Sequence, residues 1–145
     1  MVANPKTDPI PLLISLLDTT WDVANTSGVK PIVVDGGGGR KFRREAQGLI
    51  TVYQGGPVRR ESLVVRGDFK FHWEPVVAHV NANSRTKQHE LLKEVERILN
   101  LKRKDPDGYW DWMEDLGETP VADYPEWYST KVNVEFIANS IAVAE

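Results

Sequence analysis

The chain has 145 residues, of which 41% are hydrophobic, and its formal net charge is −3. This length fits one domain, 1–145, with an ordinary core, and the acidic balance argues against a dedicated nucleic-acid binder. The sequence contains no cysteine, which excludes disulfides and thiolate zinc sites.

Residues 1–8 are interpreted as a loose tail without the basic and apolar regions of a signal peptide. No apolar run approaches the roughly 20 residues that cross a bilayer, so we expect a soluble, intracellular product with no membrane contact. A helix is predicted over 9–22. Asp8 suits an N-cap, Pro9 suits the first turn, and the apolar residues that follow have helical spacing: Leu12, Leu13, Leu16, Leu17 and Trp21.

Short strands are predicted at 32–34, 49–53 and 63–65 from their β-branched and aliphatic residues. The segment 35–48 lies between the first two strands. It contains four consecutive glycines followed by a cluster of basic residues: Arg40, Lys41, Arg43 and Arg44. We interpret this segment as a mobile basic loop, since glycine adds backbone freedom that is costly to order.

The longest strand signal covers 69–82. Phe69, Phe71 and Trp73 alternate with polar residues, which predicts one aromatic and one polar face. Pro75 cannot donate to a strand ladder, so it predicts a bend, a bulge or an edge at that point.

A second helix is predicted from Ser84 or Thr86 to Asn100. Its apolar face comprises Leu91, Leu92, Val95, Ile98 and Leu99. The pair Glu94 and Arg97, at i and i+3, is interpreted as lying on the solvent side, as is Glu90 with Lys93. A final strand is predicted over 130–138, where Val132, Val134 and Phe136 alternate with polar residues.

The region 103–128 is interpreted as an irregular acidic crossover rich in aromatic residues, with one short helical turn at 109–116. Its tryptophans either cover one end of the sheet or anchor a subunit interface. The order helix, strands, helix, strand predicts an α+β fold, in which a mostly antiparallel sheet is flanked by two main helices.

The glycine run does not match a phosphate-binding loop. A Walker loop ends in Gly-Lys-Ser/Thr before a helix, whereas here Arg40 follows the last glycine and Phe42 follows Lys41. The histidines lack the spacing of a metal site (His72, His79 and His89), and no serine lies in a nucleophile elbow. We therefore predict no cofactor, no metal and no catalytic residue.

Charge is unevenly distributed along the chain. A basic zone over 40–66 contains seven cations against two glutamates, and 105–126 is an acidic zone. One basic and one acidic surface would allow copies of the chain to pair head to tail. The same basic zone, with Phe42 or Tyr53 stacking on bases, is also consistent with an α+β module that binds nucleic acid.

The chain from 9 to 140 resembles the tail-terminator, or tail-completion, proteins of long-tailed phages and archaeal viruses. The similarity lies in the order of its segments: a helix PLLISLLDTTW, a strand FHWEPVVAHVNA, a helix RTKQHELLKEVERIL, a Trp-containing loop and a strand YSTKVNVEFIA. The chain also looks like the related head–tail joining proteins of the virus neck.

This resemblance implies an α+β protein of the virion tail or neck, made in the host cytoplasm and without catalytic activity. It implies a homohexameric ring that caps the tail tube, stops tube polymerisation and docks to the head connector. The implied partners are further copies of the chain, the tail tube protein and a neck or head connector protein. Whether DNA approaches the ring lumen is left open.

The residues predicted to contact an acidic neighbour are Arg40, Lys41, Arg43, Arg44, Arg59 and Arg60. The residues predicted at the opposite interface are Trp110, Trp112 and Trp127. The alternatives are a neck adaptor, a nucleic-acid-binding module that uses the basic zone, and an enzyme without a recognisable motif.

Overall fold

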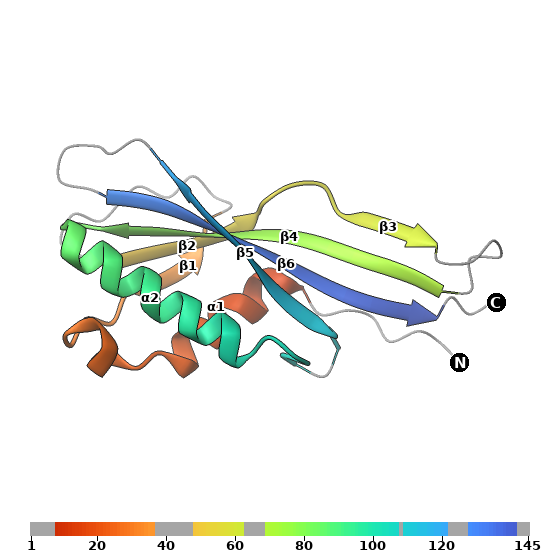
Figure 1. Ribbon diagram of the computed structural model, residues 1–145, viewed down its shortest axis with the longest axis horizontal. Coiled ribbons are helices and arrows are strands. Elements are labelled where there is room, and N and C mark those ends of the chain that lie inside the picture. Colours follow the sequence, from red (N-terminus) through yellow and green to blue (C-terminus); the bar gives the residue numbers. More distant parts are fainter. Residues whose placement is uncertain (1–7, 37–47, 63–68, 108, 122–127, 142–145) are drawn as a thin grey trace.

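Two helices lie against one side of a twisted β-sheet in the computed structural model of the protein (Figure 1). The structure describes residues 8–36, 48–62, 69–107, 109–121 and 128–141, and for 60–62, 69–70 and 139–141 it describes the backbone alone. The elements in chain order are α1 (Pro9–Thr20), the 3-10 helix η1 (Val23–Thr26), β1 (Ile32–Asp35), β2 (Gly48–Gln54), β3 (Arg59–Ser62), β4 (Phe69–Ala82), α2 (Arg85–Leu101), β5 (Trp112–Pro120) and β6 (Tyr128–Ile141).

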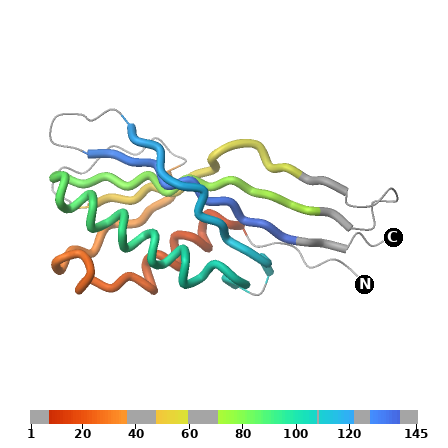
Figure 2. Tube along the Cα trace, viewed as in Figure 1, coloured from red at the N-terminus to blue at the C-terminus, as the bar shows by residue number. Residues whose placement is uncertain are grey.

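The sheet has six strands, in the order β1-β2-β4-β6-β5, with β3 also beside β4 (Figure 2). β1 and β2 are parallel, and the other pairs are antiparallel. The predicted α+β class with a mostly antiparallel sheet is therefore confirmed. The predicted strand at 63–65, the tail over 1–7 and most of the predicted basic loop, 37–47, lie outside the described residues.

Both helices begin where the sequence predicts. The Asp8 carboxylate accepts a hydrogen bond from the backbone N–H of Ile10 at 3.0 Å, and Pro9 occupies the first turn. Ser84 Oγ accepts a hydrogen bond from the backbone N–H of Lys87 at 3.2 Å. Such caps satisfy amides that have no partner within the helix, so both starts follow from local sequence.

The core lies between the helices and the side of the sheet that they cover, which we call the inner face. Alternate residues of each strand point to the opposite side, the outer face. Because burying an aliphatic side chain contributes about 1.5–3 kcal/mol, a one-residue slip of a strand would be costly. The main core residues are Leu13, Leu17, Ile50, Val52, Val76, Ala78, Val80, Leu91, Val95, Ile98, Val132, Val134 and Phe136.

Pro75 lies in the middle of β4, which continues through it with unbroken pairing to β6. Its carbonyl oxygen accepts a hydrogen bond from the backbone N–H of Gly55 at 2.9 Å. The N–H and C=O of one strand residue point to the same neighbouring strand. The side of β4 on which Pro75 lacks an N–H is therefore the side of β2 and β3, and Pro75 lies between the residues that pair with β2 and those that pair with β3. Neither β2 nor β3 pairs with Pro75, so the predicted edge at this residue is confirmed on that side of β4.

The region 103–128, predicted to be irregular with a helical turn, contains strand β5. A bulge shifts the pairing of β5 with β6 between Asp115 and Gly117, and Gly117 has a φ of 101°. Residues 116–120 are all exposed. A bulged edge strand with polar side chains lacks the regular apolar alternation by which a strand is recognised, and this prediction was wrong for that reason.

The sheet extends beyond both helices at one end, to the right in Figure 1. β4 and β6 have 14 residues each and span roughly 45 Å at about 3.3 Å per residue. The 17 residues of α2 span only about 26 Å. We call this end of the sheet the ribbon; it consists of β3, residues 69–74 of β4 and residues 136–141 of β6, and on its inner face Phe136 and Ala138 still pack in the core.

Glu94 of α2 is only 1% exposed, so its predicted position on the solvent side was wrong. Its carboxylate accepts hydrogen bonds from Arg97 Nε at 2.6 Å, from the backbone N–H of Asp22 at 2.6 Å and from Asn25 Nδ2 at 3.0 Å. Arg97 also donates to the carbonyl oxygen of Thr20 at 2.9 Å. This network fastens α2 to the end of α1 and to η1.

We expect Glu94→Gln to lower the free energy of unfolding by about 2 kcal/mol at neutral pH, because the neutral amide replaces a buried acceptor of several charged and backbone donors. The measurement is denaturant-induced unfolding. Glu96→Gln, at an exposed position on the same helix, is the matched control and should leave stability within about 0.5 kcal/mol. Equal stability of the two variants would contradict this assignment.

The same variant should change how stability depends on pH. Burial alone would raise the pKa of the Glu94 carboxyl, but the hydrogen bonds from Arg97, from the Asp22 amide and from Asn25 outweigh burial and lower the pKa below its ordinary value. The stabilisation is therefore present above the ordinary pKa and is lost as pH falls through the lowered pKa. Unfolding curves recorded in acid should be less pH-dependent for Glu94→Gln than for the wild type.

Candidate partner-binding surface

Aromatic side chains gather on the outer face of the ribbon. The rings of Phe71 and Trp73 have centroids 5.2 Å apart at an interplanar angle of 34°, and both side chains are half-buried. Ile137 of β6 lies opposite Trp73, and Trp112 of β5 lies opposite Ile137. Because such cross-strand neighbours attract one another, these four residues form an apolar row across β4, β6 and β5, which we call the aromatic row.

Arg59 of β3 borders the aromatic row. Its Cζ atom lies 5.0 Å from the centroid of the Trp73 ring, and its Nη2 atom lies 3.0 Å from Glu135 Oε2. The Arg59 side chain is 54% exposed, so each of these contacts contributes on the order of 1 kcal/mol or less. Together they hold the guanidinium against the outer face.

Two glutamates face each other on the outer face, because Glu114 of β5 is in register with Glu135 of β6. Like charges directly opposite one another destabilise a sheet. Here each carboxylate has its own arginine, since Arg103 Nη2 lies 3.3 Å from Glu114 Oε1 and Arg59 pairs with Glu135. The result is a set of two ion pairs beside the aromatic row.

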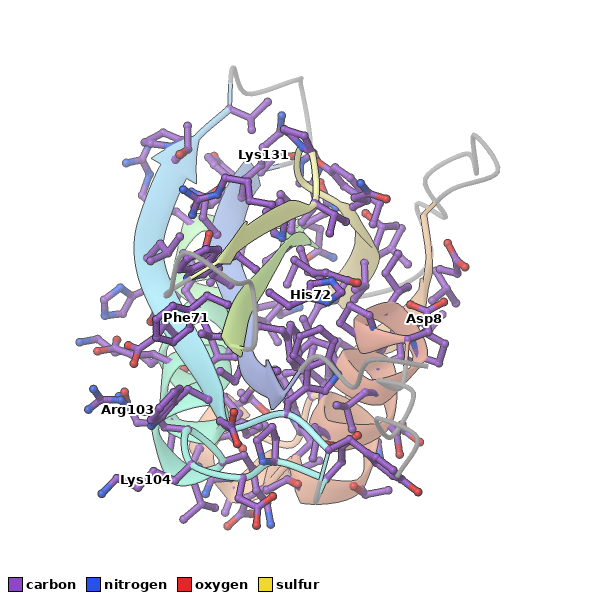
Figure 3. All side chains as sticks on the ribbon, turned by 90° about the vertical axis from the view of Figure 1, so that its right-hand side faces the viewer. Asp8, Phe71, His72, Arg103, Lys104 and Lys131 are labelled. Carbon is purple, nitrogen blue, oxygen red and sulfur yellow. The ribbon has the colours of Figure 1, made fainter. Side chains whose placement is uncertain are left out.

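The inner face of the ribbon is polar where the outer face is aromatic. His72 Nε2 and Glu74 Oε1 lie 2.9 Å apart, and Figure 3 shows Phe71 and His72 on opposite sides of β4. The His72 and Trp110 rings are 5.6 Å apart between centroids, as are those of Trp110 and Phe136. Trp110 is 1% exposed, so it packs in the core of its own chain and leaves no surface for the predicted subunit contact.

A second polar group lies on the outer face between β2, β4 and β6. Tyr53 Oη lies 3.5 Å from His79 Nδ1, and His79 Nε2 is buried with no hydrogen-bond partner in the described part of the chain. Burial and, to a smaller extent, the charge of Lys131 lower the pKa of His79, so the imidazole is neutral at neutral pH.

The Ser129 hydroxyl donates a hydrogen bond to Asn81 Oδ1. The hydroxyl therefore points toward a side-chain amide and not toward a base.

The histidines lie on three different surfaces: His72 on the inner face of β4, His79 on its outer face and His89 on α2. Within the described ranges, no group of three or more His, Cys, Asp or Glu side chains could hold a metal ion. No helix in those same ranges has both the length and the apolar character to cross a membrane. The chemistry that is present on the ribbon is that of a contact surface, with aromatic rings, an aliphatic side chain and ion pairs.

The residues predicted to make subunit contacts divide into three groups. Arg59 and Trp112 lie on the outer face, with Trp112 half-buried, and the Arg60 backbone lies in β3. Trp110 lies in the core. The others lie outside the described residues: Arg40, Lys41, Arg43, Arg44 and Trp127.

Sequence reasoning missed four members of this surface: Phe71, Trp73, Glu135 and Arg103. A usable signal was present, because the apolar residues occupy odd positions before Pro75 and even positions after it. In a continuous strand this reversal places the aromatic residues on the face opposite the aliphatic core. The sequence analysis did not use this reversal, because it described the alternation before and after Pro75 separately.

Comparisons with known proteins do not assign a family to this chain. No protein-family model matches it, and no curated protein matches it.

We expect Trp110→Ala to lower the free energy of unfolding by about 3–5 kcal/mol, because it leaves a cavity beside Phe136. Trp112→Ala, two residues away at a half-buried position, is the matched control and should cost about 1–2 kcal/mol. Chemical denaturation of both variants measures the difference. Equal losses would contradict the assignment of Trp110 to the core and Trp112 to the surface.

Proposed function

We propose that the protein is a structural component of a tailed virion, which acts as the tail terminator at the head–tail interface. In this role a closed ring of identical subunits caps the finished tail tube, stops its polymerisation and docks to the head connector. The proposal begins from the resemblance in element order, and the α+β fold agrees with what that resemblance implies.

The observation that carries the proposal is the ribbon. It extends past the helices with the aromatic row on one face and the His72–Glu74 pair on the other. Aromatic residues with arginine at the margin have the composition of a protein–protein interface. A neighbouring subunit or the tube would cover the surface that the helices are too short to reach.

A closed ring also needs two different contact surfaces on each subunit. The described end of the basic zone includes β3, which borders β4, whereas the acidic zone includes β5, which borders β6. β3 and β5 therefore lie at different borders of the sheet. This separation supports head-to-tail contacts between copies of the chain.

The nucleic-acid alternative has less support from the described residues. Arg59, the basic-zone residue whose side chain the structure describes, is paired with Glu135 of its own chain. Arg103, a further cation near the aromatic row, is likewise paired with Glu114 of its own chain. The surface is better suited to a protein partner.

The proposal is tested by assembly of the purified chain. We expect a hexamer in light scattering and native mass spectrometry, with its population rising as protein concentration rises. Added to polymerising tail tube protein, the chain should bind one tube end and shorten the tubes seen by electron microscopy, because a capped end cannot add subunits. An unrelated acidic protein of similar size should leave tube length unchanged.

Other outcomes would identify the alternatives. A ring that binds the head connector but not the tube would indicate a neck adaptor. A chain that stays monomeric at all concentrations, also with the tube protein present, would contradict the proposal. Retention of duplex DNA by such a monomer at physiological salt would favour the nucleic-acid alternative.

A further inference from the structure

We propose that His79 makes the sheet acid-sensitive: when its imidazole takes up a second proton, the pairing of β4 with β2 and β6 is weakened. This device belongs to the single chain and does not depend on the proposed ring. Three features produce it, namely a buried ring nitrogen, the lack of a hydrogen-bond partner for that nitrogen, and a lysine on the neighbouring strand.

His79 lies in the part of β4 that both β2 and β6 flank. In register, Thr51 of β2 lies on one side of it and Lys131 of β6 on the other. Its neighbours along the strand, Ala78 and Val80, pack in the core under the helices, so the His79 side chain points to the outer face. A change of charge at this residue therefore acts on both neighbouring strands.

The two ring nitrogens of His79 have different surroundings. Nδ1 lies 3.5 Å from Tyr53 Oη, whereas Nε2 is buried and has no hydrogen-bond partner in the described part of the chain. A neutral imidazole carries one N–H, and the imidazolium carries two. In the charged ring, Nε2 becomes a buried donor without an acceptor, which is costly, and more so for a charged group. The folded chain therefore favours the neutral ring.

The side chains that face the ring do not compensate a positive charge. Lys131 is the directly opposed residue of β6, and like charges in that position destabilise a sheet. Tyr53 of β2 is the other titratable side chain beside the ring, and its phenol is neutral in acid. The neighbours on the same face of β4 are Val77 and Asn81, which do not titrate. Among the described residues, no carboxylate faces the imidazole.

The loss of stability has a defined pH range. Burial and, to a smaller extent, Lys131 hold the pKa of His79 in the folded chain below its ordinary value, which is about 6.5. Below that value the unfolded chain binds more protons than the folded chain, so stability falls as pH falls, until the folded chain is protonated as well. Glu94 acts at lower pH, because its pKa lies below that of an ordinary carboxyl.

The test compares the wild type with His79→Gln, whose side chain is polar and does not titrate. Between about pH 7 and about pH 5, the unfolding equilibrium constant of the wild type should rise on the order of tenfold more than that of the variant. Denaturant-induced unfolding at each pH gives both constants. His89→Gln, at an exposed position on α2, is the matched control and should keep the pH dependence of the wild type.

An NMR titration of the His79 ring in the folded wild type follows the same protonation directly. Its midpoint should lie clearly below about pH 6.5, and Lys131→Gln should raise it, because the imidazolium then has no cation beside it. A midpoint at the ordinary value or above it would overturn the proposal. So would a folded His79→Gln variant that loses as much stability in mild acid as the wild type. Neither result bears on the proposed ring.

Discussion

The pairing of β4 with β6 is the constraint on which the rest of this structure depends. The two strands run antiparallel in unbroken register over 14 residues each, and β2, β3 and β5 all attach to one of them. Two helices of ordinary length cannot cover strands of this length. The core and the uncovered ribbon are therefore two consequences of one mismatch between strand length and helix length (Figure 1).

Polar contacts stabilise both ends of the sheet, the end that the helices cover and the end that extends beyond them. At the covered end, the buried carboxylate of Glu94 gathers donors from α1, η1 and α2 and holds the helical layer together. At the ribbon, Arg59 and Arg103 neutralise two glutamates that the strand register places opposite each other. Burial makes the first network important for stability, whereas exposure makes the second more suitable for exchange with a partner.

The proposed ring at the end of a tail tube would give these features a common explanation. In that ring the outer aromatic row would be a contact surface for a neighbouring subunit or the tube. The Ser129–Asn81 hydrogen bond strengthens the middle of the same face. The sheet would then act as a rigid plate, with its borders used for assembly and its faces for packing.

The sequence by itself determined the features that depend on near neighbours. The helix starts at Pro9 and Arg85 follow from caps one residue away, and the alternation in β4 and β6 follows from the strand period. It also identified Arg59 and Trp112 of the candidate surface.

Tertiary structure decided which face of each element is covered. Trp110 and Trp112 look alike in sequence, yet pairing places one in the core and the other outside it. Glu94 is buried because it bonds to a residue 72 positions away, and no local spacing encodes such a contact.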